Sequence, residues 1–556
     1  MQITRAKTSL LTLAVAASMG IGVLVGFALP DDDLFELRKG LRIFGAVYEK
    51  VVTGYVEPVD PSHLMRVGVD AMLEELDPYT SFIDESENAR IDIITEGQYG
   101  GVGLEVGRRG GKITVVSPVA GASGYEQGVR TGDVITKVAG QSTSPLSLDD
   151  VETLLRGEPG TTVRITVKRE GASAPLTFAL TREQVEVPDV TYAGRIGDGD
   201  AFGYVKLERF TRDAPEAVES ALRDLQAQGS LQGVVLDLRD NPGGLLRAAV
   251  HVTELFVPQG AVVVSTRGRR EDAGNTYTSG RAPLLPDVPL VVLVNGQSAS
   301  ASEIVAGAIQ DHDRGVVMGT TTYGKGLVQK VRSLPHNTAL KLTTAQYYTP
   351  SGRTIQTLEA PARDTGASQP EDRAHETTTG RTVRDGDGIR PDVRVPPPSP
   401  SALERALTQR AAFFRYANHY AATHDTLATD FSVGDAELKA FRNWLDREGL
   451  QYPTRAERLL DSLRAQIEAR TPAGYEGVRD EATALRKALQ EEKTTGFDRH
   501  AADLQRHLKR EILARYVRAD RQVAALLPVD KHATAATTLL RDADRYERLL
   551  TPADAR

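Results

Sequence analysis

Two short runs of mostly aliphatic and β-branched residues constrain the fold more than any other feature of this sequence. They lie at residues 234–238 and 290–294, and a segment with helical character follows each of them. Strands that are apolar on both faces are typical of parallel sheets covered by helices on both sides. The sequence therefore predicts an α/β layer structure between residues 185 and 397.

The flanking segments have different patterns, and 556 residues are enough for several domains. Apolar side chains recur every three or four positions in residues 33–95, which predicts helices. In residues 97–182, short β-branched runs alternate with glycine turns, which predicts a small barrel-like module with a helix at 148–155. Residues 360–388 are expected to form a mobile loop. The tail from residue 401 is rich in Ala, Leu, Arg and Glu and is expected to be nearly all helix.

These patterns divide the chain into five parts, with a proline-rich linker at 396–400 before the last one. The expected parts are an N-terminal anchor or signal (1–30), an N-terminal helical part (31–96), the barrel-like module (97–182), the α/β core (183–397) and a helical C-terminal domain (398–556).

An apolar stretch at residues 10–29 follows the positive charges of Arg5 and Lys7. About 20 apolar residues suffice to span a bilayer as a helix, and a basic flank before the span leaves the following chain outside the cytoplasm. We expect an uncleaved anchor in the cytoplasmic membrane, with the rest of the chain on the periplasmic or extracellular side. Small residues around Ala16 leave open the alternative of a cleaved signal.

Composition excludes several classes of site. The chain has no cysteine, which removes disulfides, thiolate zinc sites and a cysteine nucleophile. Its net charge is −8 and no basic stripe appears, so nucleic acid is not an expected partner. The histidines of the tail show no paired metal-ligand spacing. We therefore expect neither a metal nor another cofactor.

Ser300 lies where the apolar run 290–294 gives way to a predicted helix at 301–310. A serine at this junction is close to helix N-terminal N–H groups that attract an anion, and strand–turn–nucleophile–helix is a recurring arrangement. An ordinary N-cap serine is the alternative for this segment taken alone. Gly243 and Gly244 follow the other apolar run, and glycines there could bring backbone N–H groups close to a developing oxyanion.

Lys325 lies between two glycines, which is unusual for a lysine that serves only as surface charge. A serine nucleophile needs a base, and a lysine can act as one if burial lowers its pKa toward neutrality. Gln329, four residues later, could orient the lysine. A histidine base, either His312 or His251, remains the alternative.

These segments resemble the carboxyl-terminal processing, or tail-specific, serine peptidase family over about residues 35–397. The resemblance rests on seven motifs in family order: Gln98-Tyr-Gly-Gly-Val-Gly-Leu104, Arg130-Thr-Gly-Asp-Val-Ile135, Leu155-Arg-Gly-Glu-Pro-Gly-Thr161, Asp237-Leu-Arg-Asp-Asn-Pro-Gly-Gly244, Ser298-Ala-Ser-Ala-Ser-Glu303, Tyr323-Gly-Lys-Gly-Leu-Val-Gln329 and Asp387-Gly-Ile-Arg-Pro-Asp392. It implies Ser300 as nucleophile, Lys325 as base, Gln329 as the residue that orients the base, and an oxyanion hole from the N–H groups of Gly243 and Ala301.

The same resemblance implies an α/β (α+β) core of the ClpP/crotonase-like type, with an inserted PDZ domain and a C-terminal all-α domain. PDZ domains bind a peptide C-terminus as an added strand. The implied carboxylate-binding and groove residues, together with Arg156, which the family implicates in coupling peptide binding to activity, are Gly100, Gly101, Val102, Gly103, Leu104, Val106, Val151, Leu154, Leu155 and Arg156. A surface salt bridge is the alternative role for Arg156.

The implied activity is endoproteolysis near the C-termini of envelope proteins whose ends are free and apolar. Two rival interpretations remain: an inactive PDZ scaffold or adaptor, and a hydrophobic-ligand carrier built on a related core. Intact Ser300, Lys325 and Gln329 favour the enzyme. The helical tail could mediate a homo-oligomer or bind an adaptor protein, and no residue in it points to one of these roles.

Overall fold

The computed structural model describes most of the chain. The described residues are 31–84, 97–269, 274–356, 373–397, 399–428, 431–449, 455–470 and 476–552. They divide into two compact units, one made of residues up to 85 together with 329–343, and the other of residues 86–328 and 344–556.

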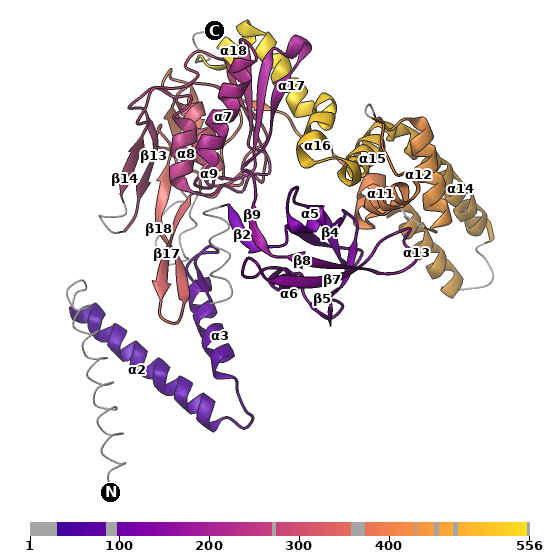
Figure 1. Cartoon of the computed structure of the whole chain (residues 1–556), viewed down its shortest axis with the longest axis horizontal. Coiled ribbons are helices and arrows are strands. Elements are labelled where there is room, and N and C mark those ends of the chain that lie inside the picture. The colour runs from indigo at the N-terminus through magenta and orange to yellow at the C-terminus, as the bar shows by residue number, and fades with distance from the viewer. Residues whose placement is uncertain are drawn as a thin grey trace. The chain divides into compact units, whose positions relative to one another are not determined.

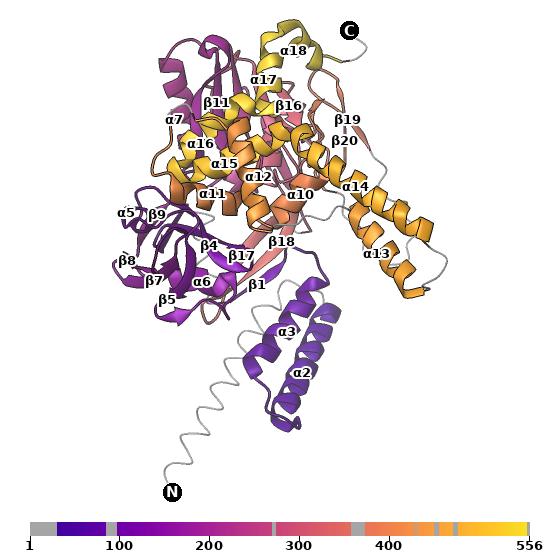
Figure 2. The same ribbon diagram turned by 90° about the vertical axis from the view of Figure 1, so that its right-hand side faces the viewer.

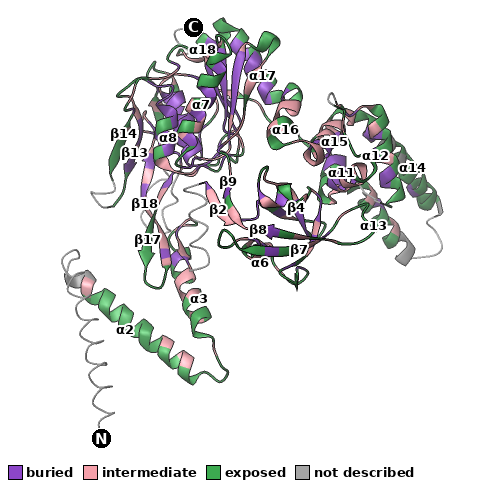
Figure 3. Cartoon of the chain, viewed as in Figure 1, coloured by how far each residue is buried: buried purple, intermediate pink, exposed green. Residues whose placement is uncertain are grey.

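The first unit contains α2 (Asp31–Gly54), α3 (Pro61–Glu74) and β1 (Ser81–Ile83). Helix α3 begins where Asp60 accepts hydrogen bonds from the N–H groups of Ser62 and His63, and Pro61 occupies its first turn. Strand β1 pairs antiparallel with β18, with Phe82 opposite Leu340. Helix α2 is exposed along most of its length (Figure 3).

The expected membrane anchor at residues 10–29 lies outside the described residues. Within the part of the chain that the structure describes, no helix combines the length and the apolar composition needed to cross a membrane.

The glycine-rich module, residues 97–182, which the sequence predicts to be barrel-like, is a small domain of antiparallel strands. Its sheet has the strand order β3-β4-β5-β7-β8, β6 pairs with β5, and β2 pairs separately with β9. Buried valine, leucine and isoleucine side chains from the strands and from α6 form its core. The elements are β2 (Gln98–Gly101), β3 (Leu104–Arg109), β4 (Lys112–Pro118), α5 (Ser123–Glu126), β5 (Val134–Val138), β6 (Gln141–Ser142), α6 (Leu148–Leu155), β7 (Thr162–Lys168), β8 (Leu176–Thr181) and β9 (Glu183–Glu186).

The α/β core is built on a six-stranded sheet with the order β10-β11-β12-β15-β16-β21, in which all pairs except β10–β11 are parallel. The two apolar runs of the sequence form its central strands β12 and β15. The elements are β10 (Val190–Ile196), β11 (Phe202–Leu207), α7 (Ala214–Ala227), β12 (Gly233–Asp237), α8 (Leu246–Thr253), β15 (Leu290–Val294), α9 (Ala301–Asp311), β16 (Val316–Gly319) and β21 (Val393–Arg394).

Both faces of this sheet are covered, which explains why its central strands β12 and β15 are almost entirely apolar. On β12, Val234 and Leu236 pack with α7, α8 and α9 on one face, whereas Val235 belongs to a second apolar cluster on the other. That second cluster contains side chains of α17 (Lys531–Arg541) and α18 (Ala543–Leu549). The sheet therefore lies between two helical layers (Figures 1 and 2).

A second sheet supports the core. Strand β13 (Val262–Arg267) pairs antiparallel with β14 (Asn275–Thr278) and with the end of β18 (Thr338–Tyr348), which itself pairs with β17 (Leu327–Leu334). The expectation of a mobile loop over residues 360–388 is wrong in part, because β19 (Ala374–Glu376) and β20 (Thr382–Arg384) form an antiparallel hairpin there. Residues 360–372 of that range lie outside the described residues. Three-residue strands bury too little to leave a readable alternation in the sequence.

The tail is helical, as expected, but its helices contribute to two different cores. Aromatic and aliphatic side chains of α10, α11, α12 and α15 form a core of their own, whereas α17 and α18 complete the α/β core. The remaining helices of the tail are α10 (Ala402–Gln409), α11 (Ala412–Thr423), α12 (Asp435–Arg447), α13 (Arg455–Arg470), α14 (Glu476–Arg499), α15 (Ala501–Tyr516) and α16 (Ala519–Leu526). An amphipathic helix pattern does not reveal which apolar surface it will cover, so the sequence could not separate these groups.

Candidate active site

Ser300 lies between β15 and α9, where the sequence places it. Its backbone has a positive φ of 55°, which is rare for a residue with a side chain and is found where surrounding contacts enforce it. The residue is 8% exposed. A strained serine that directly precedes a buried helix is the local geometry of a nucleophile at a strand–helix junction.

Glu303, in the first turn of α9, binds both halves of the expected dyad through their backbones. Its Oε2 accepts hydrogen bonds from the N–H groups of Ser300 (2.7 Å) and Lys325 (2.8 Å). Its Oε1 accepts from the N–H of Gly324 (2.7 Å) and the hydroxyl of Thr322 (2.6 Å). The carboxylate thus joins the serine turn to the lysine loop.

Burial determines the acidity of this carboxylate. The side chain of Glu303 is fully buried, and this burial raises its pKa, while the four donors partly oppose the shift by stabilising the anion. Glu303 ends one of the seven motifs of the sequence, but the sequence alone did not assign it a role. Three of its four donors lie 19 to 22 residues away, so no local pattern could have identified them.

Gly243 lies directly against Ser300. A Cβ atom at Gly243 would be 2.6 Å from the carbonyl oxygen of Ala299, 2.9 Å from the amide nitrogen of Ala301 and 3.0 Å from the Cβ of Ser300. The two residues proposed to supply oxyanion donors, Gly243 and Ala301, are therefore neighbours. In this structure the Gly243 N–H donates to Oδ1 of Asn241 (2.8 Å), so it would have to leave that partner to bind an oxyanion.

Replacing Gly243 by alanine should lower kcat/KM by about 100-fold or more, comparable to the loss of an oxyanion donor. The new Cβ would contact backbone atoms that cannot move aside independently, and φ at this position is +99°. Kinetics with a peptide substrate measure the effect. Gly260→Ala is the matched control, because Gly260 has a φ of +84° and open space around its Cβ position. Equal losses in both variants would show that backbone strain alone, and not contact with Ser300, causes the defect.

Tyr347 is a site residue that the sequence interpretation missed. Its hydroxyl lies close enough to the Ser300 side chain for that serine to affect its acidity, and burial raises the pKa of Tyr347 to about 12. Its backbone N–H also donates to the carbonyl of Gly326 (2.7 Å), next to Lys325. Tyr347 therefore contacts both the serine and the lysine loop, and at pH 7 it is a neutral hydrogen-bonding group beside the serine hydroxyl.

Lys325 is half-buried in the loop before β17, and its backbone is fixed by Glu303. The structure thus brings the backbones of Ser300 and Lys325 to one carboxylate. Gln329 belongs to the first unit, where its side-chain amide donates to Thr343 Oγ1 (3.4 Å). Its role toward Lys325 stays a prediction.

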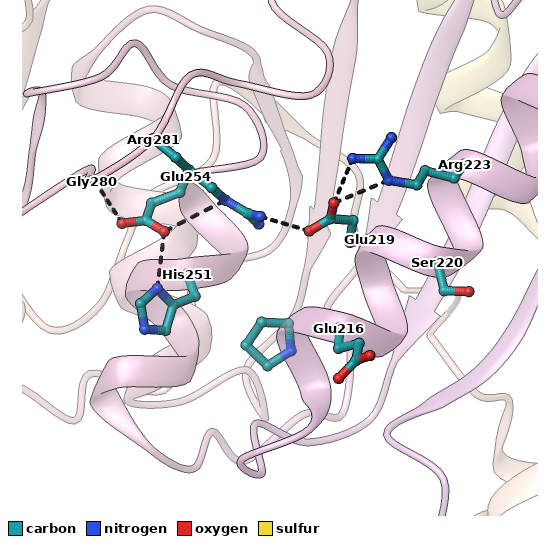
Figure 4. A pocket seen from close by; sticks show the side chains of 9 residues that line it. Glu216, Glu219, Ser220, Arg223, His251, Glu254, Gly280 and Arg281 are labelled. Atoms are coloured by element: carbon teal, nitrogen blue, oxygen red, sulfur yellow. Dashed lines mark hydrogen bonds and ion pairs between the residues drawn. The ribbon is translucent and has the colours of Figure 1, made fainter.

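The two alternative bases have other partners. Nε2 of His312 is 2.6 Å from the carbonyl oxygen of Val262, and Nδ1 of His251 is 2.9 Å from Oε2 of Glu254. His251 lines an open pocket of about 740 Å³ between α7 and α8, and Ser300 is not among the residues that line it. Figure 4 shows this pocket, where Arg281 lies between Glu254 and Glu219. These contacts give both histidines structural roles.

In the glycine-rich module, the residues expected to bind a peptide are distributed between the edge strand and the core. Strand β3 ends the main sheet and pairs with β4. Leu104 and Val106 on β3 are buried with Val151 and Leu155 of α6, and Leu154 packs at the edge of this cluster. Val102 is also buried, and the N–H of Gly124 donates to its carbonyl.

The glycines before β3 make close backbone contacts. Gly100 and Gly101 pair with β9, and Gly103 has a φ of +68° with Ala122 directly against its Cβ position. Arg156 ends α6 and forms an ion pair with Glu152 (3.3 Å) while its guanidinium lies 5.9 Å from the ring centre of Tyr99. The salt bridge considered for Arg156 is present. Its role in coupling stays a prediction.

One group of possible metal ligands occurs among the described residues. One ligand atom each from Glu404, His500 and Asp503 lies within 4.8 Å of the other two. The sequence gave no sign of this group because α10 and α15 are far apart in the chain. Asp503 already pairs with Arg506 (2.8 Å), and Glu404 accepts from the N–H of Ser401 (2.6 Å), so these side chains have structural partners without a metal.

Three models of known domain families match the chain. They are peptidase family S41 at residues 201–361, a PDZ domain at 114–169, and the C-terminal helical domain of probable PDZ-proteases at 403–540. The second of these lies within the glycine-rich module, and the third covers most of the helical tail.

The chain is also similar to individual proteins. The chain is 41% identical to the carboxy-terminal-processing protease of Bartonella bacilliformis over 321 residues, which cover 57% of this chain and 73% of that protein. It is 34% identical to the carboxyl-terminal-processing protease of Synechocystis sp. over 296 residues, 52% of this chain and 68% of that protein. The solved photosystem II D1 C-terminal processing protease aligns at 31% identity over 66% of this chain and 88% of that chain, with a TM-score of 0.37.

Proposed function

The chain belongs to the carboxyl-terminal processing serine proteases of peptidase family S41, and on this premise we propose that Ser300 and Lys325 form its catalytic dyad. The observation that carries the proposal is the Glu303 carboxylate, which binds the backbone N–H groups of both residues. A buried acid that joins these two positions aligns the serine turn with the lysine loop. Positioning of this kind is what a nucleophile and its base require.

The proposed mechanism has two stages. The neutral amine of Lys325 removes the proton of the Ser300 hydroxyl as Oγ attacks the scissile carbonyl, and the N–H groups of Gly243 and Ala301 stabilise the resulting oxyanion. The lysine then donates the proton to the leaving amine, which releases the C-terminal fragment. Water, activated by the same lysine, hydrolyses the acyl-enzyme. Tyr347, which lies beside the serine side chain, would help to position its hydroxyl, and Gln329 would orient the lysine.

The PDZ module would recruit the substrate. A peptide C-terminus can extend the sheet along β3, since β3 is an end strand with α6 beside it. N–H groups in residues 100–104 would bind the terminal carboxylate, and an apolar terminal side chain would enter between β3 and α6. Because the groove residues are buried in this structure, the peptide would have to separate Leu104 or Val106 from the helix.

The substrates would be envelope proteins with free, apolar C-termini, cut by an enzyme anchored in the cytoplasmic membrane through residues 10–29. The basic flank and the length of that stretch support this placement. Carbonate extraction of membranes and N-terminal sequencing test it, since a carbonate-soluble protein that begins after residue 16 would contradict the anchor.

Peptides with a free carboxylate should be cut faster than the same peptides amidated at the C-terminus, by about tenfold or more in kcat/KM. Amidation removes the charge that the N–H groups are proposed to bind, and a hydrogen bond to a charged group contributes about 1.5–3 kcal/mol. Binding of both peptides to Ser300→Ala separates recruitment from catalysis. If the free and amidated peptides were cut at equal rates and bound with equal affinities, the PDZ module would not recruit substrates through their terminal carboxylate.

A further inference from the structure

Asp530 is the N-cap of α17, a helix that lies on the central sheet of the protease core. Its Oδ1 accepts hydrogen bonds from the N–H groups of His532 (2.8 Å) and Ala533 (3.1 Å). The helix contributes Ala536, Leu539 and other side chains to the apolar cluster on that face of the sheet. A capping aspartate accounts for this part of the geometry, and it would serve the helix in the same way anywhere in the protein.

The same carboxylate also binds an arginine of the protease core. Arg239 Nη1 is 3.2 Å from Oδ1 of Asp530, and Nη2 is 2.9 Å from Oδ2. The guanidinium makes a second two-point contact with Asp237, through Nε to Oδ1 (2.9 Å) and Nη2 to Oδ2 (2.7 Å). Burial raises the pKa of Asp530, but the charge of Arg239 and the hydrogen bonds from Arg239 and Ala533 together outweigh it and lower the pKa. The two carboxylates together fix the arginine side chain.

Arg239 begins the loop that carries Gly243. Two residues after it, the Asn241 carbonyl accepts hydrogen bonds from the Ala299 N–H (3.0 Å) and the Ser302 hydroxyl (3.0 Å), on either side of Ser300. The Asn241 side-chain oxygen accepts from the Gly243 N–H. A shift of Arg239 would therefore reach the backbone that faces the nucleophile within a few residues.

We propose that Asp530 is a positioning residue of the active site, which acts through Arg239 to hold the loop from Arg239 to Gly244 against Ser300. The C-terminal end of the helical tail then helps to maintain the geometry of the active site. The inference rests on the proposed oxyanion role of Gly243. It assigns a catalytic contribution to a residue 291 positions away from Arg239 in the chain.

The test is Asp530→Ser in the full chain. Serine caps a helix about as well as aspartate, so α17 keeps its N-cap, but its short neutral side chain cannot make the two-point contact with Arg239. The expected result is a 10- to 100-fold lower kcat with KM within twofold, because displacing a group that faces the reacting atoms slows the chemical step more than substrate binding. Asp542→Ser is the matched control: Asp542 caps α18 by accepting from the Arg545 N–H (3.0 Å). The control should retain wild-type kcat.

A merely structural role for Asp530 would lower the melting temperature and leave kcat of the folded enzyme unchanged, and this outcome overturns the proposal. Equal kcat losses in Asp530→Ser and Asp542→Ser would also overturn it. A double-mutant cycle with Arg239→Gln should show that the two losses do not add, because both variants break the same contact. Full additivity contradicts transmission through Arg239.

Hydrogen exchange at the backbone amides of residues 239–244 gives a readout that does not depend on activity. Exchange there should be faster in Asp530→Ser than in Asp542→Ser. If it is faster while Gly243→Ala retains full activity, the proposed oxyanion role fails and the coupling stands. If exchange is unchanged while Ser300→Ala is inactive, the coupling fails and the proposed function stands.

Discussion

Substituting alanine for Ser300 or for Lys325 should each lower kcat/KM by about four to six orders of magnitude. The serine forms the acyl-enzyme and the lysine removes and returns its proton, so loss of either residue stops the same step. The double variant should therefore be no slower than the slower single variant. Rates measured on a peptide with a free apolar C-terminus, together with melting curves that show intact folding, check this result.

Lys330→Ala is the control for the lysine, since Lys330 is exposed on β17, five residues after Lys325. It should cut the peptide at the wild-type rate. Near-normal activity of Lys325→Ala, combined with loss of activity in His312→Ala or His251→Ala, would replace the lysine by a histidine base. The partners of those histidines make this outcome unexpected, because Val262 and Glu254 already bind their rings. A wild-type protein that binds peptides without cutting them would favour the scaffold interpretation.

The sequence predicts the parts of this protein whose signal is local. Strands β12 and β15 are readable because both of their faces are almost entirely apolar. The start of α9 is readable because a serine and a glutamate lie three positions apart after a strand. Ser300, Lys325 and Gly243 could be named for the same reason, as each lies in a short run that combines reactive and glycine residues.

Residues whose partners lie far along the chain could not be assigned roles from sequence. Tyr347 follows Ser300 by 47 positions and lies on a strand whose alternation gives no hint that it lies beside the serine. Asp530 looks like any other N-cap before an amphipathic helix, and only the fold shows that Arg239 shares its carboxylate. The sequence also could not show that the helices of the tail belong to two different cores. Apolar periodicity identifies the buried face of a helix and not the surface that this face covers.

Glu303→Ala should cause a large loss of both stability and activity. It removes the acceptor for four donors in a buried site, and each buried donor left without a partner costs about 1–3 kcal/mol, so a loss of at least about 3 kcal/mol in the free energy of unfolding is expected. In the protein that stays folded, kcat should fall by about 100-fold or more, because the serine turn and the lysine loop lose the group that joins them. Urea unfolding and steady-state kinetics measure the two effects.

Two further variants separate the contribution of Glu303 to stability from its contribution to catalysis: Glu303→Gln and an alanine substitution of a second buried glutamate. Glutamine keeps one acceptor oxygen and places an NH₂ group against the remaining donors, so its defects should be smaller than those of alanine and larger than zero. Glu404 is the matched control, since it caps α10 in the same way, by accepting from the N–H of Ser401, and is 3% exposed. Glu404→Ala should lose stability and retain kcat, because it caps a helix without contacting the serine turn. If Glu303→Ala retained wild-type kcat in its folded fraction, the carboxylate would be a helix cap like that of Glu404, and the proposed alignment of Ser300 with Lys325 would have to come from other contacts.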